Sequence, residues 1–307
     1  MGALFWIAAL KKRPIIIASL LLVGLFVFFL VLALSVVGLT GGGRSNQFAL
    51  GDKVGVVEVL GVITSSAETI EQLHDYRDDA SIKSVVLRVD SPGGGVGPSQ
   101  EIHDEVQLLT AIKPVVVSMG SAAASGGYYI AAPADLIVAN PGTITGSIGV
   151  IMEFTNVQEL LEKIGLRSQV VKSGQHKDIG SPVRPMSDED RAILQAMIDD
   201  VHSQFIEAVS AGRELSPEKV RELADGRIFT GRQARDLGLV DELGGLQVAI
   251  GKAAELGGIE GKPHVVYPPE EKPRLIDFLI EESVQRLHHA LQQESRAGFQ
   301  YLWPGLK

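Results

Sequence analysis

The chain contains no cysteine among its 307 residues. A disulfide, a thiol nucleophile and a thiolate metal site are therefore excluded. The sequence also lacks a Walker A phosphate loop, a His-Glu-x-x-His zinc motif and a Rossmann dinucleotide fingerprint. Acidic residues outnumber basic residues, so the net charge is −9 at pH 7. Since an acidic protein is repelled by phosphate backbones, we expect no nucleic-acid partner.

Charged residues are absent between Arg13 and Arg44, and residues 14–39 are almost wholly apolar. As a helix this stretch would measure roughly 35–40 Å, which exceeds the ~30 Å hydrocarbon core of a bilayer. Basic residues directly precede it, so residues 1–13 are predicted to stay in the cytoplasm while the body crosses. A cleaved signal peptide is the alternative, but its apolar core would span only about 7–15 residues. We favour a single-pass anchor in the cytoplasmic membrane.

The body after a flexible glycine-rich linker at 40–53 is predicted to be α/β. Its first part alternates β-branched runs with helical patterns, which predicts a mostly parallel sheet covered on both faces. In such sheets, sites form at the carboxyl ends of the strands. The expected strands lie at 54–60, 84–89, 113–119, 135–139, 150–153 and 168–172, with helices at 66–78, 99–112 and 156–164.

The second part of the body is predicted to be mainly helical. A long helix should begin after Ser187, a good N-cap residue, and end at Gly212. Shorter helices are expected after Ser216 and at 247–256. We expect one domain over 54–265.

A tail is expected over 266–307. Prolines at 268, 269 and 273 indicate a hinge, and residues 275–291 form an amphipathic pattern. That helix could pack on the body or on a neighbouring subunit, contact the membrane surface, or be a mobile tail.

The sequence GSAAASGGYY at 120–129 is the stretch around which the chain is organised. Ser125 follows a predicted strand and begins a short helix, whose N-terminus offers free N–H groups and a partial positive charge. Gly126 and Gly127 allow a close approach of the backbone. A hydroxyl at this position suits attack on a carbonyl, because the resulting oxyanion would meet those donors. Packing of small residues between strand and helix explains the same stretch, so both interpretations stay open.

A serine nucleophile needs a base, and the loop at 172–182 offers His176 and, as the stronger candidate, Lys177. A lysine acts as a base only when neutral, so its pKa must fall from about 10.4 to about 7–8. Burial and nearby hydroxyls would lower it, whereas a carboxylate would oppose this. Asp178 is adjacent, but neighbouring side chains of an extended loop point apart. On its residue type alone, Lys177 is more readily explained as a surface lysine.

Five motifs carry a resemblance to a known family. They are DSPGGG at 90–95, GSAAASGGYY at 120–129, GTITGSIG at 142–149, KSGQHKDIGSP at 172–182 and DGRIFTGRQA at 225–234. In this order they resemble signal peptide peptidase A, a family of bacterial membrane-anchored Ser–Lys peptidases. The resemblance covers residues 54–256 and implies a fold related to Clp protease and crotonase.

The resemblance implies a role for each matching residue. Ser125 corresponds to the nucleophile and Lys177 to the general base. Ser147 corresponds to a hydroxyl that orients the lysine. Gly94 and Gly126 match the positions whose backbone N–H groups form the oxyanion hole.

The resemblance also implies substrates and partners. Family members cleave remnant signal peptides, so apolar peptide substrates are expected. This chain is similar to the half-length form of the family, whose rings place a serine of one protomer against a lysine of the next. We therefore expect a homo-oligomer, an octamer, with shared active sites and with neither cofactor nor metal.

Two other functions are compatible with parts of the sequence. A non-catalytic membrane scaffold of the same fold would bind apolar segments and need no base. A crotonase-type acyl-CoA enzyme would share the glycine-rich loops, but neither loop carries a suitably placed glutamate.

Overall fold

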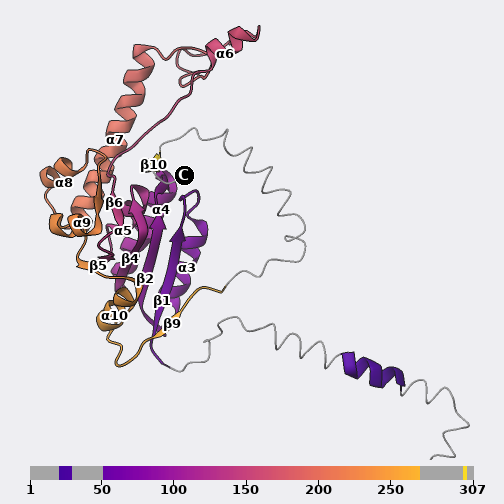
Figure 1. Cartoon of the computed structure of the whole chain (residues 1–307), viewed down its shortest axis with the longest axis vertical. Helices are drawn as coiled ribbons and strands as arrows, with labels where there is room; N and C mark the ends of the chain where they lie inside the picture. Colours follow the sequence, from indigo (N-terminus) through magenta and orange to yellow (C-terminus); the bar gives the residue numbers. More distant parts are fainter. Residues whose placement is uncertain (1–20, 30–50, 270–299, 303–307) are drawn as a thin grey trace, which may run out of the picture. The chain divides into compact units, whose positions relative to one another are not determined.

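The computed structural model describes residues 21–29, 51–269 and 300–302. Two compact units divide the chain, residues 1–50 and residues 51–307. Figure 1 shows the elements of both units.

The first unit contributes one short described segment, residues 21–29, which is helical and exposed. The rest of the expected anchor at 14–39 lies outside the described residues, as do the segment 1–13 and most of the linker at 40–53. Among the residues that the structure describes, no helix is both long and apolar enough to cross a membrane. The anchor therefore stays a prediction.

The second unit is built on a sheet of eight strands within the described residues, in the order β7-β6-β4-β2-β1-β9, with β5 beside β4 and β8 beside β5. All pairs are parallel except β6 with β7. The expected parallel α/β fold is therefore confirmed. The strands are β1 (Lys53–Leu60), β2 (Ile82–Ser91), β4 (Val115–Ala124), β5 (Leu136–Ala139), β6 (Ile144–Gly146), β7 (Ile228–Thr230), β8 (Glu242–Leu243) and β9 (His264–Val266).

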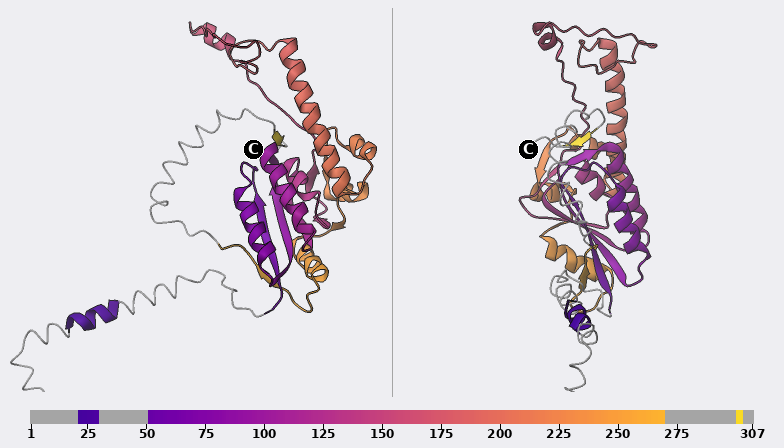
Figure 2. Two further views of the ribbon diagram at one scale, coloured as in Figure 1. Left: turned by 180° about the vertical axis from the view of Figure 1, so that it is seen from behind. Right: turned by 90° about the vertical axis from the view of Figure 1, so that its right-hand side faces the viewer.

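Helices cover both faces of this sheet. Neighbouring strands align their valines in register, so Val56, Val86 and Val116 lie in one row. These valines pack with α10 (Leu246–Leu256), whereas the alternate residues of the same strands pack with α3 (Ala67–Asp78), α4 (Val96–Thr110) and α5 (Gly126–Ala131). Burial on both faces explains why the strands are nearly continuous apolar runs. Figure 2 shows the same layers from two further sides.

Residues 152–198 leave the body as an arm, which comprises α6 (Gln158–Lys163), a loop and the first half of α7 (Asp188–Gly212). The strands expected at 150–153 and 168–172 are wrong, because neither stretch forms a strand. Val170 and Val171 are exposed on the arm. Their β-propensity has no effect there, since a strand needs a neighbour with which to pair.

The long helix α7 begins as predicted and connects arm to body. Ser187 is its N-cap residue, whose hydroxyl accepts a hydrogen bond from the Asp190 N–H at 3.0 Å, and the Asp190 carboxylate accepts one from the Ser187 N–H at 3.3 Å. This reciprocal pair is a capping box. The apolar stripe of α7 is divided, because Phe205 and Val209 are buried in the body whereas Met197 is exposed on the arm.

The remaining helices, α8 (Pro217–Leu223) and α9 (Gly231–Leu237), follow α7. Ser216 is the N-cap residue of α8, as expected. Beyond β9, residues 267–269 have no regular structure. The rest of the expected hinge and the amphipathic helix at 275–291 lie outside the described residues.

Tyr128 gives a test of the packing that supports α5. It is fully buried, and its phenol donates a hydrogen bond of 2.9 Å to the carbonyl of Leu239. Tyr128→Phe should lower the free energy of unfolding by about 1–2 kcal/mol, because the buried carbonyl loses its donor. Chemical denaturation would measure this, with Tyr267→Phe at an exposed position as the control. Equal stability of the two variants would contradict the prediction.

Candidate active site

Ser125 lies at the junction of β4 and α5, as the N-cap residue of the helix, and only 1% of it is exposed. Its backbone has φ 55° and ψ −119°. Residues other than glycine rarely adopt such a conformation, which costs about 1–3 kcal/mol. A strained strand-to-helix turn also presents the nucleophile of α/β-hydrolases. The chain has this kind of turn although it lacks the Gly-x-Ser-x-Gly pattern.

Hydrogen bonds on both sides hold the turn in place. The N–H of Ser125 donates to the carbonyl of Gly146 at 2.8 Å, directly after the pairing of Ala124 with Gly146. The carbonyl of Ser125 accepts from the N–H groups of Tyr128 and Tyr129, both at 2.9 Å. The surrounding structure thus determines the conformation of Ser125.

Ser147 is the neighbour of Ser125 at the edge of the sheet. It directly follows Gly146, so the two serines continue adjacent parallel strands, β4 and β6, past their last paired residues. Ser147 is buried, has a positive φ of 51°, and its N–H donates to the carbonyl of Arg227 at 2.8 Å. The structure therefore brings together these two predicted site residues.

Gly94 lies in a short strand of glycines, β3 (Gly93–Gly95), which follows β2 and packs beside α5. A Cβ atom on Gly94 would lie 2.1 Å from the carbonyl oxygen of Ile63, so only glycine fits there. The other edge of β3 pairs antiparallel with β10 (Gln300–Leu302), with Tyr301 opposite Gly94. The sequence did not predict β10, because nothing in its three residues indicates so distant a partner.

Gly126 is the first residue of α5, so its N–H has no acceptor within the helix. Its neighbour Gly127 lies tightly against the end of β2, because a Cβ atom there would be 2.8 Å from the carbonyl oxygen of Ser91. The loops that carry Gly94 and Gly126 are therefore adjacent. This position suits two backbone donors that converge on one oxyanion.

Lys177 lies on the arm, in the series of turns that precedes α7, and it is exposed. Figures 1 and 2 show the arm extending away from α5. Within the described part of the chain, no hydrogen bond or ion pair involves the Lys177 side chain, and none joins it to Ser125. The described part of the chain therefore brings together Ser125, Ser147 and the two glycine loops, but it does not join Lys177 to them.

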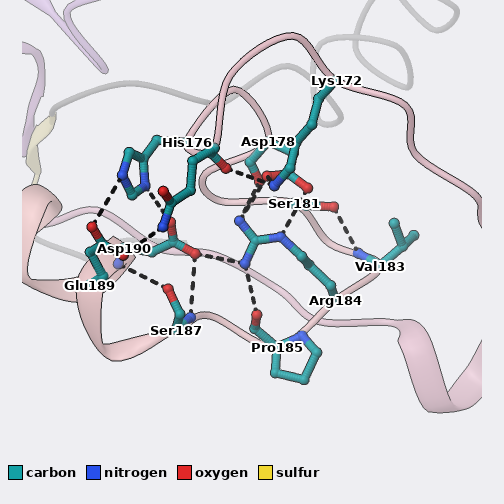
Figure 3. Close-up of polar contacts among 11 residues, drawn as sticks. Lys172, His176, Asp178, Ser181, Val183, Arg184, Pro185, Ser187, Glu189 and Asp190 are labelled. Atoms are coloured by element: carbon teal, nitrogen blue, oxygen red, sulfur yellow. Dashed lines mark hydrogen bonds and ion pairs between the residues drawn. The ribbon is translucent and has the colours of Figure 1, made fainter.

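A polar cluster surrounds the loop of Lys177 and was not predicted (Figure 3). Its centre is Arg184, which donates to the carboxylate of Asp178 at 2.9 and 3.0 Å and to that of Asp190 at 2.6 Å. Hydrogen bonds from Arg184, and then from Lys172, hold the pKa of Asp178 well below its usual range. Those from Arg184, and then from Ser187, do the same for the pKa of Asp190.

Comparison with known proteins identifies the family. A model of peptidase family S49 matches residues 107–260, and a Clp protease model matches residues 58–137. The chain belongs to peptidase family S49. The expected resemblance and the expected enzyme class, a serine protease, are thereby confirmed.

Several relatives support this assignment. A Synechocystis protein named "Putative protease" is 47% identical over 209 residues, which cover 68% of this chain and 76% of the relative. An Enterococcus faecium protein named "Putative signal peptide peptidase SppA" is 38% identical over 216 residues, or 66% of this chain and 61% of that protein. Protease 4 of Salmonella typhi is 39% identical over 243 residues, which cover 79% of this chain but only 39% of the longer protein.

The strain at Ser125 gives a prediction of its own. Glycine adopts positive φ without cost, so Ser125→Gly should be more stable than Ser125→Ala by about 1 kcal/mol. Thermal unfolding of the two variants would measure the difference. At Ser121, an exposed position within β4, the order should reverse, because glycine weakens a regular strand by roughly 0.5–1 kcal/mol. The same order at both positions would contradict strain at Ser125.

Proposed function

We propose that this family S49 protein is a membrane-anchored endopeptidase that cleaves remnant signal peptides and other apolar peptides by a Ser–Lys dyad. The observation that carries the proposal is the buried, strained Ser125 with Ser147 beside it and two glycine loops around it. Strain at a single residue is retained only where the surrounding structure imposes it, and such positions cluster at reactive sites.

The reaction divides into two acyl transfers. Ser125 Oγ attacks the scissile carbonyl while neutral Lys177 Nζ accepts its proton, and the N–H groups of Gly94 and Gly126 stabilise the oxyanion. Lys177 then gives the proton to the leaving amine, which releases the first product. Water, activated by the same lysine, hydrolyses the acyl-enzyme and regenerates Ser125. Ser147 would accept or donate a hydrogen bond that orients the amine.

A second copy of the chain supplies the lysine in this proposal. The arm supports it, because an open groove of about 350 Å³ runs along it. The groove has a mixed lining of apolar residues, such as Phe154 and Leu194, and of polar residues, among them Arg184 and Arg191. Further apolar side chains are exposed on the same arm, including Leu160, Ile164, Leu166 and Val171. Exposed apolar surface of this kind favours association. A ring, an octamer as in the half-length family form, would cover it and complete each site.

Peptide substrates would bind as an added strand. β3 pairs with β10, which supports the view that the glycine strand accepts an extended chain in antiparallel register next to Ser125. Backbone hydrogen bonds give affinity in this mode, and side-chain pockets select the sequence. The predicted anchor at 14–39 would hold the domain at the outer surface of the cytoplasmic membrane, where such peptides remain after export.

The dyad is tested by two substitutions. Ser125→Ala and Lys177→Ala should each lower kcat/KM for an apolar peptide at least about a thousandfold, because each removes an essential step. Ser121→Ala and Lys262→Ala, at exposed positions outside the site, serve as matched controls. Activity retained in either site variant would refute the Ser–Lys mechanism. A non-cutting scaffold would bind the peptide without cleaving it in the wild type.

Sharing of sites between copies is tested by mixing the two inactive variants. When Ser125→Ala and Lys177→Ala chains are co-expressed in equal amounts, random assembly should restore about a quarter of wild-type activity, because that fraction of sites receives an intact serine and an intact lysine. Each variant alone, measured at the same total concentration, gives the baseline. No recovery in assemblies shown to contain both chains would mean that each copy supplies both groups.

A further inference from the structure

Arg184 joins two parts of the arm that lie on either side of it in the sequence (Figure 3). Its guanidinium donates to both carboxylate oxygens of Asp178, to the Asp178 carbonyl at 3.2 Å and to the Pro185 carbonyl at 3.0 Å. A fifth hydrogen bond reaches Asp190 in the first turn of α7. A planar guanidinium that forms this many bonds fixes the loop relative to the helix far better than a single ion pair would.

Both sequence neighbours of Lys177 are held by this cluster. Asp178 is bound by Arg184 and also by Lys172, whose ammonium lies 2.6 Å from its Oδ1. His176 lies 3.4 Å from Asp190 and 3.4 Å from Glu189 through its two ring nitrogens. Lys177 is exposed between these two fixed residues. The loop is therefore anchored on both sides of a side chain that it leaves available.

The cluster also neutralises the carboxylate of Asp178, the residue that follows Lys177 in the sequence. The loop forms turns at 175–180 instead of the extended chain that the sequence suggested, so the argument that adjacent side chains point apart does not apply to Lys177 and Asp178. The side chain of Asp178 is only 13% exposed, so solvent would only weakly screen a free carboxylate at this position. Arg184 and Lys172 instead satisfy both of its oxygens. The other acids of the cluster, Glu189 and Asp190, face His176 and Arg184.

We propose that Arg184 is a positioning residue for the general base, because it holds the loop that presents Lys177 and neutralises the carboxylate of Asp178 beside it. This inference rests on the proposed function, in which Lys177 accepts the proton of Ser125. Arg184 touches neither substrate nor reacting atoms in this role. It keeps the amine in place and prevents Asp178 from favouring its protonated form.

The pH dependence of kcat/KM in the full-length protein tests the proposal. Without Arg184, the carboxylate of Asp178 favours the protonated amine, so the base becomes available only at higher pH. Arg184→Gln should therefore move the acidic limb of the profile upward by about one pH unit, with activity recovering at alkaline pH. The position of the limb does not depend on how many sites assemble, so it separates this role from a loss of folding or association.

Three further variants make the test specific. The double variant Asp178→Asn with Arg184→Gln removes both charges, so its limb should return toward that of the wild type. Arg184→Lys keeps the charge without the planar fork, so it should keep the wild-type limb even if the maximal rate falls. Arg167→Gln is the matched control, since Arg167 is an exposed arginine on the same arm outside the groove, and it should leave the profile unchanged.

Different experimental results would refute the proposal for Arg184 and the function on which it rests. If Arg184→Gln lowers the rate equally at every pH and its limb stays at the wild-type position, Arg184 is merely a structural ion pair and the inference is wrong. If Lys177→Ala keeps its activity, the Ser–Lys mechanism itself is wrong, whatever the profile of Arg184→Gln. An inactive Lys177→Ala with a shifted Arg184→Gln limb supports both.

Discussion

The hydrogen bond between the N–H of Ser125 and the carbonyl of Gly146 is the contact on which the candidate site depends. It extends the pairing of β4 with β6 one residue beyond Ala124, and so it forces the chain to turn at a serine instead of at one of the glycines that follow. Gly146 can accept this bond only because it lacks a side chain, since a Cβ atom would lie 2.5 Å from the ring of Phe229. The position of Ser147 follows from the same pairing. One backbone contact between two strands therefore places two serines at adjacent strand ends.

The body and the arm obey different physical constraints. In the body, valines of adjacent strands are buried between helices on both faces of the sheet, and such close packing leaves little freedom to the strand ends. The arm has no comparable core. Its described loop is held by the hydrogen bonds of Arg184 and by the capping box of Ser187 instead. Ser125 thus belongs to the closely packed part of the chain, whereas Lys177 belongs to a part fixed by ionic contacts.

The sequence was informative wherever local residue types decide the structure. Runs of valine correctly indicated the buried parallel strands. The capping residues Ser187 and Ser216 correctly indicated where α7 and α8 begin. Prediction from the sequence was wrong where a strand depends on a neighbouring strand. At 168–172, β-branched residues have no strand beside them. The residues around Ser125 predicted a junction of strand and helix, but the positive φ of that serine depends on Gly146 in another strand. Arg184 could not be found from its sequence, because its partners meet only once the loop has folded back on α7.

The proposed dyad would divide its two residues between body and arm, which has a consequence for control of the activity. Under the proposed mechanism, an isolated chain has a preformed nucleophile and oxyanion site but no base within reach of Ser125. Assembly then contributes chemistry as well as stability, so activity should follow the concentration of complete assemblies by mass action. In this arrangement the lysine needs to be held rigidly. Ser125 would lie on another copy, so packing within the lysine's own chain could not adjust the position of the amine relative to it. The ionic cluster around Arg184 meets that requirement on an arm that has little apolar core of its own.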